Sequence, residues 1–216
     1  MIELVKPRLR GWIHLLTAPV ALMVGIVLLT ITPTTGGKVA VAIFVASTVL
    51  LFGHSALYHL GTWRQPLAAV LRRLDHANIF LLIAGTYTPL AVILLDAKTA
   101  RLLLTVVWSG ALAGIAARVF WLHAPRWFYT PLYVILGWVA LGFLPQFRAA
   151  GGNAILWLVV AGGVSYTLGA VVYALKRPDP FPTWFGFHEV FHLATVGGYV
   201  CHCVAIFLAV GRTYVS

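Results

Sequence analysis

Residues 186–210 of the chain read GFHEVFHLATVGGYVCHCVAIFLAV, two histidines followed by an apolar run. His188 and His192 are four residues apart, so on an α-helix they share one face and lie about 6 Å apart along the axis. This spacing lets a helix present two imidazoles to one metal ion, and Glu189 completes an H-E-x-x-H string. The run is also long enough to cross a bilayer. We therefore predict a membrane helix that begins with a pair of metal ligands.

The composition predicts an integral membrane protein. Of the 216 residues, 61% are hydrophobic and 9% are charged, whereas a soluble domain has about 25% charged residues. The chain has 15 Lys and Arg against 5 Asp and Glu, a net charge of +10. These basic residues are spread over short connections, which indicates topology signals rather than a nucleic-acid surface.

Seven apolar runs divide the chain, each near the roughly 20 residues that a bilayer crossing needs. They cover residues 12–31, 39–60, 75–95, 102–122, 128–147, 154–175 and 188–210. Clusters of Pro, Gly and charged residues separate the runs, and no cluster is long enough to form a soluble domain. We predict an all-α bundle of seven transmembrane helices that forms a single domain over residues 1–216.

The distribution of Lys and Arg predicts the orientation of this bundle. With a cytoplasmic N-terminus, ten basic residues fall on the inner side and five on the outer side. The ten are Lys6, Arg8, Arg10, Arg64, Arg72, Arg73, Arg118, Arg126, Lys176 and Arg177. Because cytoplasmic loops carry the excess of positive charge, we expect the N-terminus inside and the C-terminus outside.

This orientation places polar groups from three separate runs in the inner leaflet. The runs that contain His59 and Asp75 end and begin on the same side as the run that begins with His188. Catalytic zinc commonly has three protein ligands and a water molecule. We expect His59, His188 and His192 as ligands, with Asp75 binding the metal directly or through water. Imidazole ligands without thiolate favour Zn²⁺.

Other interpretations of these residues stay open. Ser55 is one helical turn before His59, so its hydroxyl could bond the same water or a polarised carbonyl. Each histidine alone could instead bond a neighbouring helix. Asp75 could be the N-cap of its helix, where the helix dipole favours a carboxylate.

Four stretches carry a resemblance to a known family: GHSALYH (53–59), LDHANI (74–79), AGTYTP (84–89) and GFHEVFH (186–192). Together they resemble the hemolysin III branch of the progestin and adipoQ receptor family, over nearly the whole chain. The resemblance implies an adiponectin-receptor-like seven-helix fold in a bacterial plasma membrane. It also implies a zinc site formed by S-x-x-x-H, an aspartate and H-x-x-x-H, which match Ser55, His59, Asp75, His188 and His192. Alkaline ceramidases and other lipid hydrolases belong to the same wider group.

The expected function is zinc-dependent chemistry or sensing on a membrane lipid. As an enzyme, the protein would hydrolyse an amide- or ester-linked lipid, with the carbonyl polarised by zinc, Asp75 taking the proton and Ser55 assisting. The alternatives are a receptor-like sensor with structural zinc, a pore-forming cytolysin, and an intramembrane metalloprotease with Glu189 as base. The last leaves Ser55, His59 and Asp75 unexplained. Membrane lipids are the expected partners, while substrate and oligomeric state are not predicted.

Three further polar groups lie within the apolar runs. His14 is expected to contact a neighbouring helix or to support the metal ligands. Cys201, His202 and Cys203 are consecutive and point in different directions on a helix, so we interpret them as packing residues rather than a metal cluster. Residues 86–89 contain Pro89, which frees a backbone carbonyl, and predict a kink or a polar cavity wall.

Overall fold

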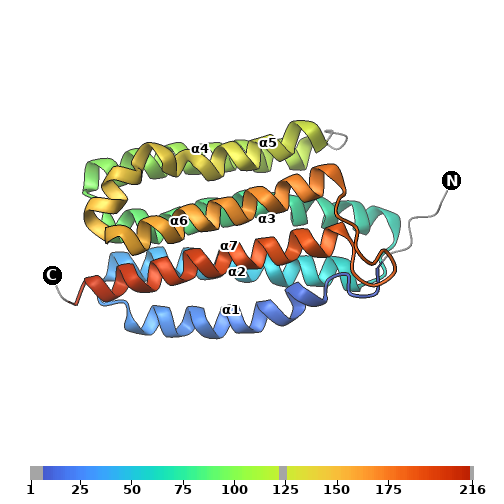
Figure 1. Cartoon of the computed structure of the whole chain (residues 1–216), viewed down its shortest axis with the longest axis horizontal. Helices are drawn as coiled ribbons and strands as arrows, with labels where there is room; N and C mark the ends of the chain where they lie inside the picture. The colour runs from blue at the N-terminus through green and yellow to red at the C-terminus, as the bar shows by residue number, and fades with distance from the viewer. Residues whose placement is uncertain (1–6, 122–125, 215–216) are drawn as a thin grey trace.

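The computed structural model describes residues 7–121 and 126–214, and over these ranges the protein is helical without a strand. The helices are α1 (Trp12–Ile31), α2 (Thr35–Leu60), α3 (Gln65–Leu94), α4 (Ala97–Phe120), α5 (Arg126–Gly137), a 3₁₀ stretch (Trp138–Phe143), α6 (Leu144–Leu175) and α7 (Phe187–Arg212). The long helices run along a common axis (Figure 1). The predicted all-α class is confirmed.

Six helical segments of the described chain are long and apolar enough to cross a membrane. Five are α1, α2, α3, α4 and α7, and the sixth is the 48-residue segment Phe128–Leu175. Gly152 interrupts this last segment with φ 74° and ψ −179°, a conformation open to glycine because it has no Cβ. The chain reverses its direction between α5 and the second half of α6, so these two helices run antiparallel along the bundle (Figure 1).

Tyr87 on α3 accounts for the 3₁₀ stretch. The Tyr87 hydroxyl donates to the Gly137 carbonyl at 2.6 Å and accepts from the Ala140 amide at 2.7 Å. A side chain that inserts into the backbone ladder in this way interrupts the α-helical bonding pattern. Tyr87, one of the polar residues near Pro89, therefore bonds to helix backbone and joins α3 to the segment after α5.

The start of α3 differs from the sequence prediction. The apolar run was expected from residue 75, whereas the helix begins at Gln65 with a proline in its first turn, the position where proline is well tolerated. The added turns contain Arg72 and Arg73 and are not apolar enough to predict as a membrane run. Asp75 thus lies ten residues inside the helix, and the interpretation of Asp75 as an N-cap is wrong.

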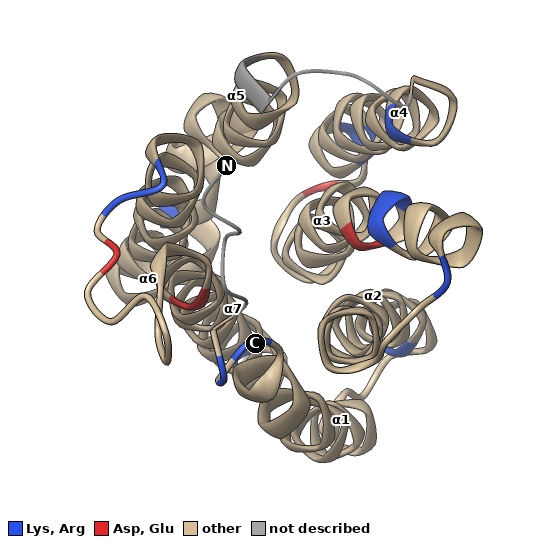
Figure 2. Cartoon of the chain, turned by 90° about the vertical axis from the view of Figure 1, so that its right-hand side faces the viewer, with Lys and Arg blue, Asp and Glu red and all other residues tan. Residues whose placement is uncertain are grey.

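The helices surround a common interior in which α7 is next to α1, α3 and α6 (Figure 2). Phe44, Phe52, Phe80 and Phe147 are buried there, while Leu16 and Met23 of α1 are 66% and 59% exposed on the outside. In the described chain, no Cα atom of α2 lies within 8 Å of one in α7. Contacts between α2 and α7 must therefore be made by long side chains.

Candidate metal centre

Three histidines meet at the end of the bundle where α2 ends and α7 begins. His59 is in the last turn of α2, and His188 and His192 occupy the first two turns of α7. One ligand atom from each lies within 4.8 Å of the others. His59 and His192 are buried, and His188 is half-buried. The three imidazoles bridge the space between α2 and α7.

The separation of these nitrogens fits a shared metal ion. His59 Nε2 and His188 Nε2 are 3.2 Å apart. Two Zn–N bonds of about 2.0–2.1 Å at a tetrahedral angle would put the nitrogens about 3.3 Å apart. Over residues 7–121 and 126–214, these imidazoles are the one group of three metal-competent side chains close enough to share an ion. A neutral, imidazole-only donor set suits a divalent transition metal.

Asp75 and Ser55 lie beside this group but outside it. Asp75 Oδ2 is 3.6 Å from His59 Nε2, too far for a hydrogen bond. The Ser55 hydroxyl, buried one turn before His59, interacts with the same carboxylate. The five residues that the sequence analysis singled out are thus brought together, with the three histidines central and the serine and aspartate adjacent.

The Glu189 carboxylate bonds to Gly186 and Arg10 and not to the three histidines. Its Oε2 accepts from the Gly186 amide at 2.7 Å, which caps the start of α7, and its Oε1 accepts from Arg10 Nε. The residue has no exposed surface. Both carboxylate oxygens are therefore occupied by structural contacts, although the sequence string H-E-x-x-H is that of a metalloprotease base.

His14 of α1 contacts one of the three histidines of the centre. Its ring is stacked on the His192 ring, with centroids 3.7 Å apart and planes 11° from parallel. The sequence analysis expected His14 to contact a neighbouring helix or to support the metal ligands, and the contact with α7 confirms the first of these expectations. Arg10, by contrast, was counted only as a topology signal, because its partner Glu189 is 179 residues away in the chain.

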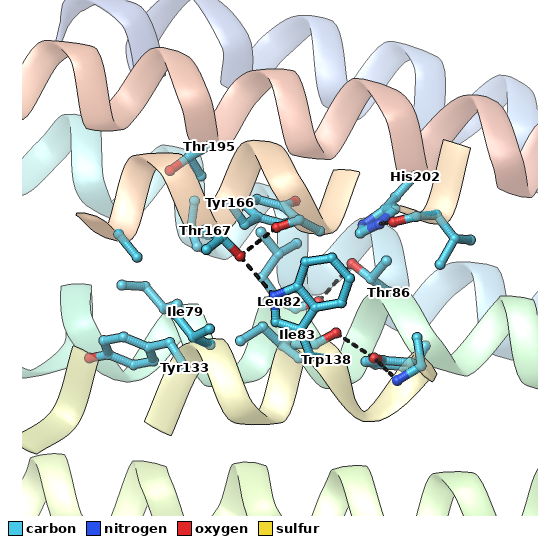
Figure 3. A pocket seen from close by; sticks show the side chains of 18 of the residues that line it. Ile79, Leu82, Ile83, Thr86, Tyr133, Trp138, Tyr166, Thr167, Thr195 and His202 are labelled. Atoms are coloured by element: carbon cyan, nitrogen blue, oxygen red, sulfur yellow. Dashed lines mark hydrogen bonds between the residues drawn. The ribbon is translucent and has the colours of Figure 1, made fainter. Parts of the chain in front are cut away.

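A cavity of about 110 Å³ lies inside the bundle beside the centre, and Figure 3 shows side chains of its wall, among them Ile79, Tyr133 and His202. Asp75 and His188 line one end, and its wall follows α3 from Asp75 to Leu90, a rise of about 22 Å at 1.5 Å per residue. Most lining residues are apolar or aromatic. His202 reaches the far part of the wall, where its Nε2 is 3.2 Å from the Val159 carbonyl.

Arg118 is a second residue whose surroundings the sequence does not reveal. It is 7% exposed, and its guanidinium lies 4.2 Å from the centroid of the Tyr129 ring. The Tyr129 ring in turn contacts the His76 ring at 5.6 Å. A basic residue near the end of an apolar run suggests a position in the headgroup layer, whereas here the cation is buried and lies over the Tyr129 ring.

Comparison with known proteins identifies the family of the chain. A model of the family described as Haemolysin-III related matches residues 2–203. The Hemolysin-3 homolog of Bacillus subtilis (strain 168) is 32% identical over 160 residues, which cover 74% of this chain and 72% of that protein. Hemolysin-3 of Bacillus cereus is 31% identical over 166 residues, with coverage of 76% and 72%. The adiponectin receptor protein of Drosophila melanogaster is 25% identical over 191 residues, with coverage of 76% and 41%. The chain therefore belongs to the haemolysin-III-related family.

Proposed function

We propose that this protein is a zinc-dependent membrane hydrolase that cleaves an amide or ester bond of a lipid in the cytoplasmic leaflet. The observation that carries the proposal is the cavity, because its wall includes Asp75 and His188 at the histidine cluster and then continues between apolar side chains. A reacting bond at the cluster and an acyl chain along the wall would fit this arrangement. Such a site suits a lipid better than a water-soluble substrate.

His59, His188 and His192 would hold the zinc ion. When bound, zinc supplies a Lewis acid that polarises the acyl carbonyl and makes water a stronger acid. The carboxylate of Asp75 is the general base, since it lies 3.6 Å from His59 Nε2 and is 15% exposed at its side chain. Ser55 orients that carboxylate through its hydroxyl.

The bonds and the proton of the proposed hydrolysis can be followed in two steps. The oxygen of water forms a bond to the acyl carbon, and Asp75 accepts the proton. The bond from the acyl carbon to the amide nitrogen or ester oxygen then breaks, and Asp75 returns the proton to this leaving atom. The products are a fatty acid and an amine or alcohol, and the enzyme regains its starting protonation state.

The proposal includes seven membrane crossings with the N-terminus in the cytoplasm. The Phe128–Leu175 segment would supply two crossings, because Gly152 divides it and the chain reverses there (Figure 1). The start of α1 and the end of α7 lie at opposite ends of the bundle, which an odd number of crossings requires (Figure 1). The excess of Lys and Arg at the end with the histidines supports a site in the inner leaflet of a bacterial plasma membrane.

The other candidate functions have less support. A purely structural zinc would need no cavity at its ligands, whereas His188 lines one. A metalloprotease would need Glu189 as base, whereas both its oxygens are bonded to Arg10 and Gly186. A receptor-like sensor remains the function to propose if zinc is bound but no lipid is cleaved.

The test is a lipid-cleavage assay with purified protein in vesicles. One set of vesicles would contain an N-acyl amide lipid and the other an ester-linked phospholipid, and mass spectrometry would measure free fatty acid. We expect release from one set by the zinc-loaded protein and no release by the His188→Ala/His192→Ala variant. Absence of release from both sets, with zinc bound, would contradict the hydrolase and leave the sensor.

A further inference from the structure

His192 is held in an unusual way for a metal ligand. A histidine that binds a metal almost always donates its other ring N–H to a carboxylate, carbonyl or water, and this bond fixes the ring. In the described part of the chain, His192 Nδ1 is buried without a hydrogen-bond partner. Within the described residues, no protein group is therefore hydrogen-bonded to this nitrogen, which leaves the neighbours of the ring faces as the contacts to consider.

His14 provides that contact through its ring face. The two rings are nearly parallel, with centroids 3.7 Å apart, and His14 is 2% exposed. Neither Nδ1 nor Nε2 of His14 has a hydrogen-bond partner of good geometry in the described chain, although the His192 backbone lies near the ring. Phe52 also contacts His14, with the ring centroids 4.9 Å apart in an edge-to-face arrangement. The His14 ring is thus in contact with both Phe52 and His192.

Contacts of the chain just before α1 determine the position of the His14 ring. Gly11 precedes the helix with φ 89°, and a Cβ atom there would lie 2.9 Å from His59 Cβ, so glycine permits the close approach. Arg10 pairs with Glu189, one residue from His188. The amides of Arg8 and Leu9 donate to the Thr183 and Trp184 carbonyls at 3.0 and 3.1 Å. The starts of α1 and α7 are thereby held in register.

We propose that His14 is a positioning residue of the metal centre, which orients the His192 imidazole by stacking and not through its ring nitrogens. The inference rests on the proposed zinc site. It assigns the start of α1 a share in metal affinity, although α1 provides no ligand. An aromatic ring of similar size should replace His14, whereas an aliphatic side chain that fills the same space should not.

The experiment compares His14→Phe with His14→Leu in the purified full chain. Zinc affinity would be measured by competition with a chromophoric chelator. We expect the Phe variant to bind zinc like the wild type and the Leu variant to bind about 10- to 100-fold more weakly, the range for outer-shell partners. In Co²⁺-substituted protein, the visible spectrum should change for Leu only. His54→Phe, the same change on α2 outside the centre, should alter neither measurement.

The outcomes separate this inference from the proposed function. Wild-type protein that binds no zinc would refute the proposed function itself. Equal zinc affinity and equal Co²⁺ spectra for the wild type and the Leu variant would overturn the positioning role alone. Equal losses in the Phe and Leu variants would show that His14 acts through a nitrogen, which also overturns the stacking proposal. Size-exclusion profiles would confirm that both variants are folded.

Discussion

Replacing Asp75 with Asn should nearly abolish lipid hydrolysis while leaving zinc bound. Asn keeps the size of the side chain but cannot accept a proton, and general-base catalysis contributes about 10²–10⁴-fold to a rate. The group of side chains that can share the ion consists of His59, His188 and His192 without Asp75. Zinc content should therefore stay near that of the wild type. The measurements are the rate of fatty acid release and the zinc content of the same sample.

Glu189→Gln is the matched control for this change, since it also converts a carboxylate to an amide. Gln can still accept from the Gly186 amide, and the lost charge affects the pair with Arg10. At saturating zinc we expect hydrolysis close to the wild-type rate. If Glu189→Gln abolished hydrolysis and Asp75→Asn did not, the roles proposed here would be wrong and the metalloprotease interpretation would be favoured.

Removal of zinc should lower the thermal stability of the protein markedly. The Cα atoms of α2 and α7 stay more than 8 Å apart in the described chain, so these helices meet through side chains. His59, His188 and His192 are among those side chains, and a shared ion would add bonds between the two helices. An ion that binds only the folded state stabilises it by about 2.7 kcal/mol when its free concentration is 100 times Kd. Unfolding with and without a chelator, followed by intrinsic fluorescence, would measure this difference.

The same measurement on His188→Ala/His192→Ala protein gives the control. This variant should unfold at the same temperature with and without chelator, because it has lost the ion in both cases. A wild-type protein whose unfolding temperature is unaffected by chelation would contradict a zinc ion that joins α2 to α7.

Much of the architecture follows from patterns that are local in the sequence. The apolar runs predict the helices because a bilayer crossing needs a continuous apolar segment. The start of α3 was missed because Arg72 and Arg73 interrupt the apolar pattern in its first turns. The 3₁₀ stretch was missed because Tyr87, which causes it, comes from another helix.

The candidate site was likewise predicted in part. Spacing placed Ser55 with His59 and His188 with His192, and the predicted topology brought these pairs and Asp75 to one end of the bundle. The stack of His14 on His192 could not be predicted, because it depends on the rotation of α1 against α7. The Arg10–Glu189 pair was equally hidden, since only the folded chain brings its two residues together.

Metal analysis of the purified protein tests the central claim most directly. Elemental analysis by plasma mass spectrometry should find close to one zinc ion per chain in the wild type. The His188→Ala/His192→Ala variant, purified in parallel and equally well folded, should contain almost none. A wild-type protein without zinc, or a variant with unchanged zinc content, would contradict the metal centre proposed here.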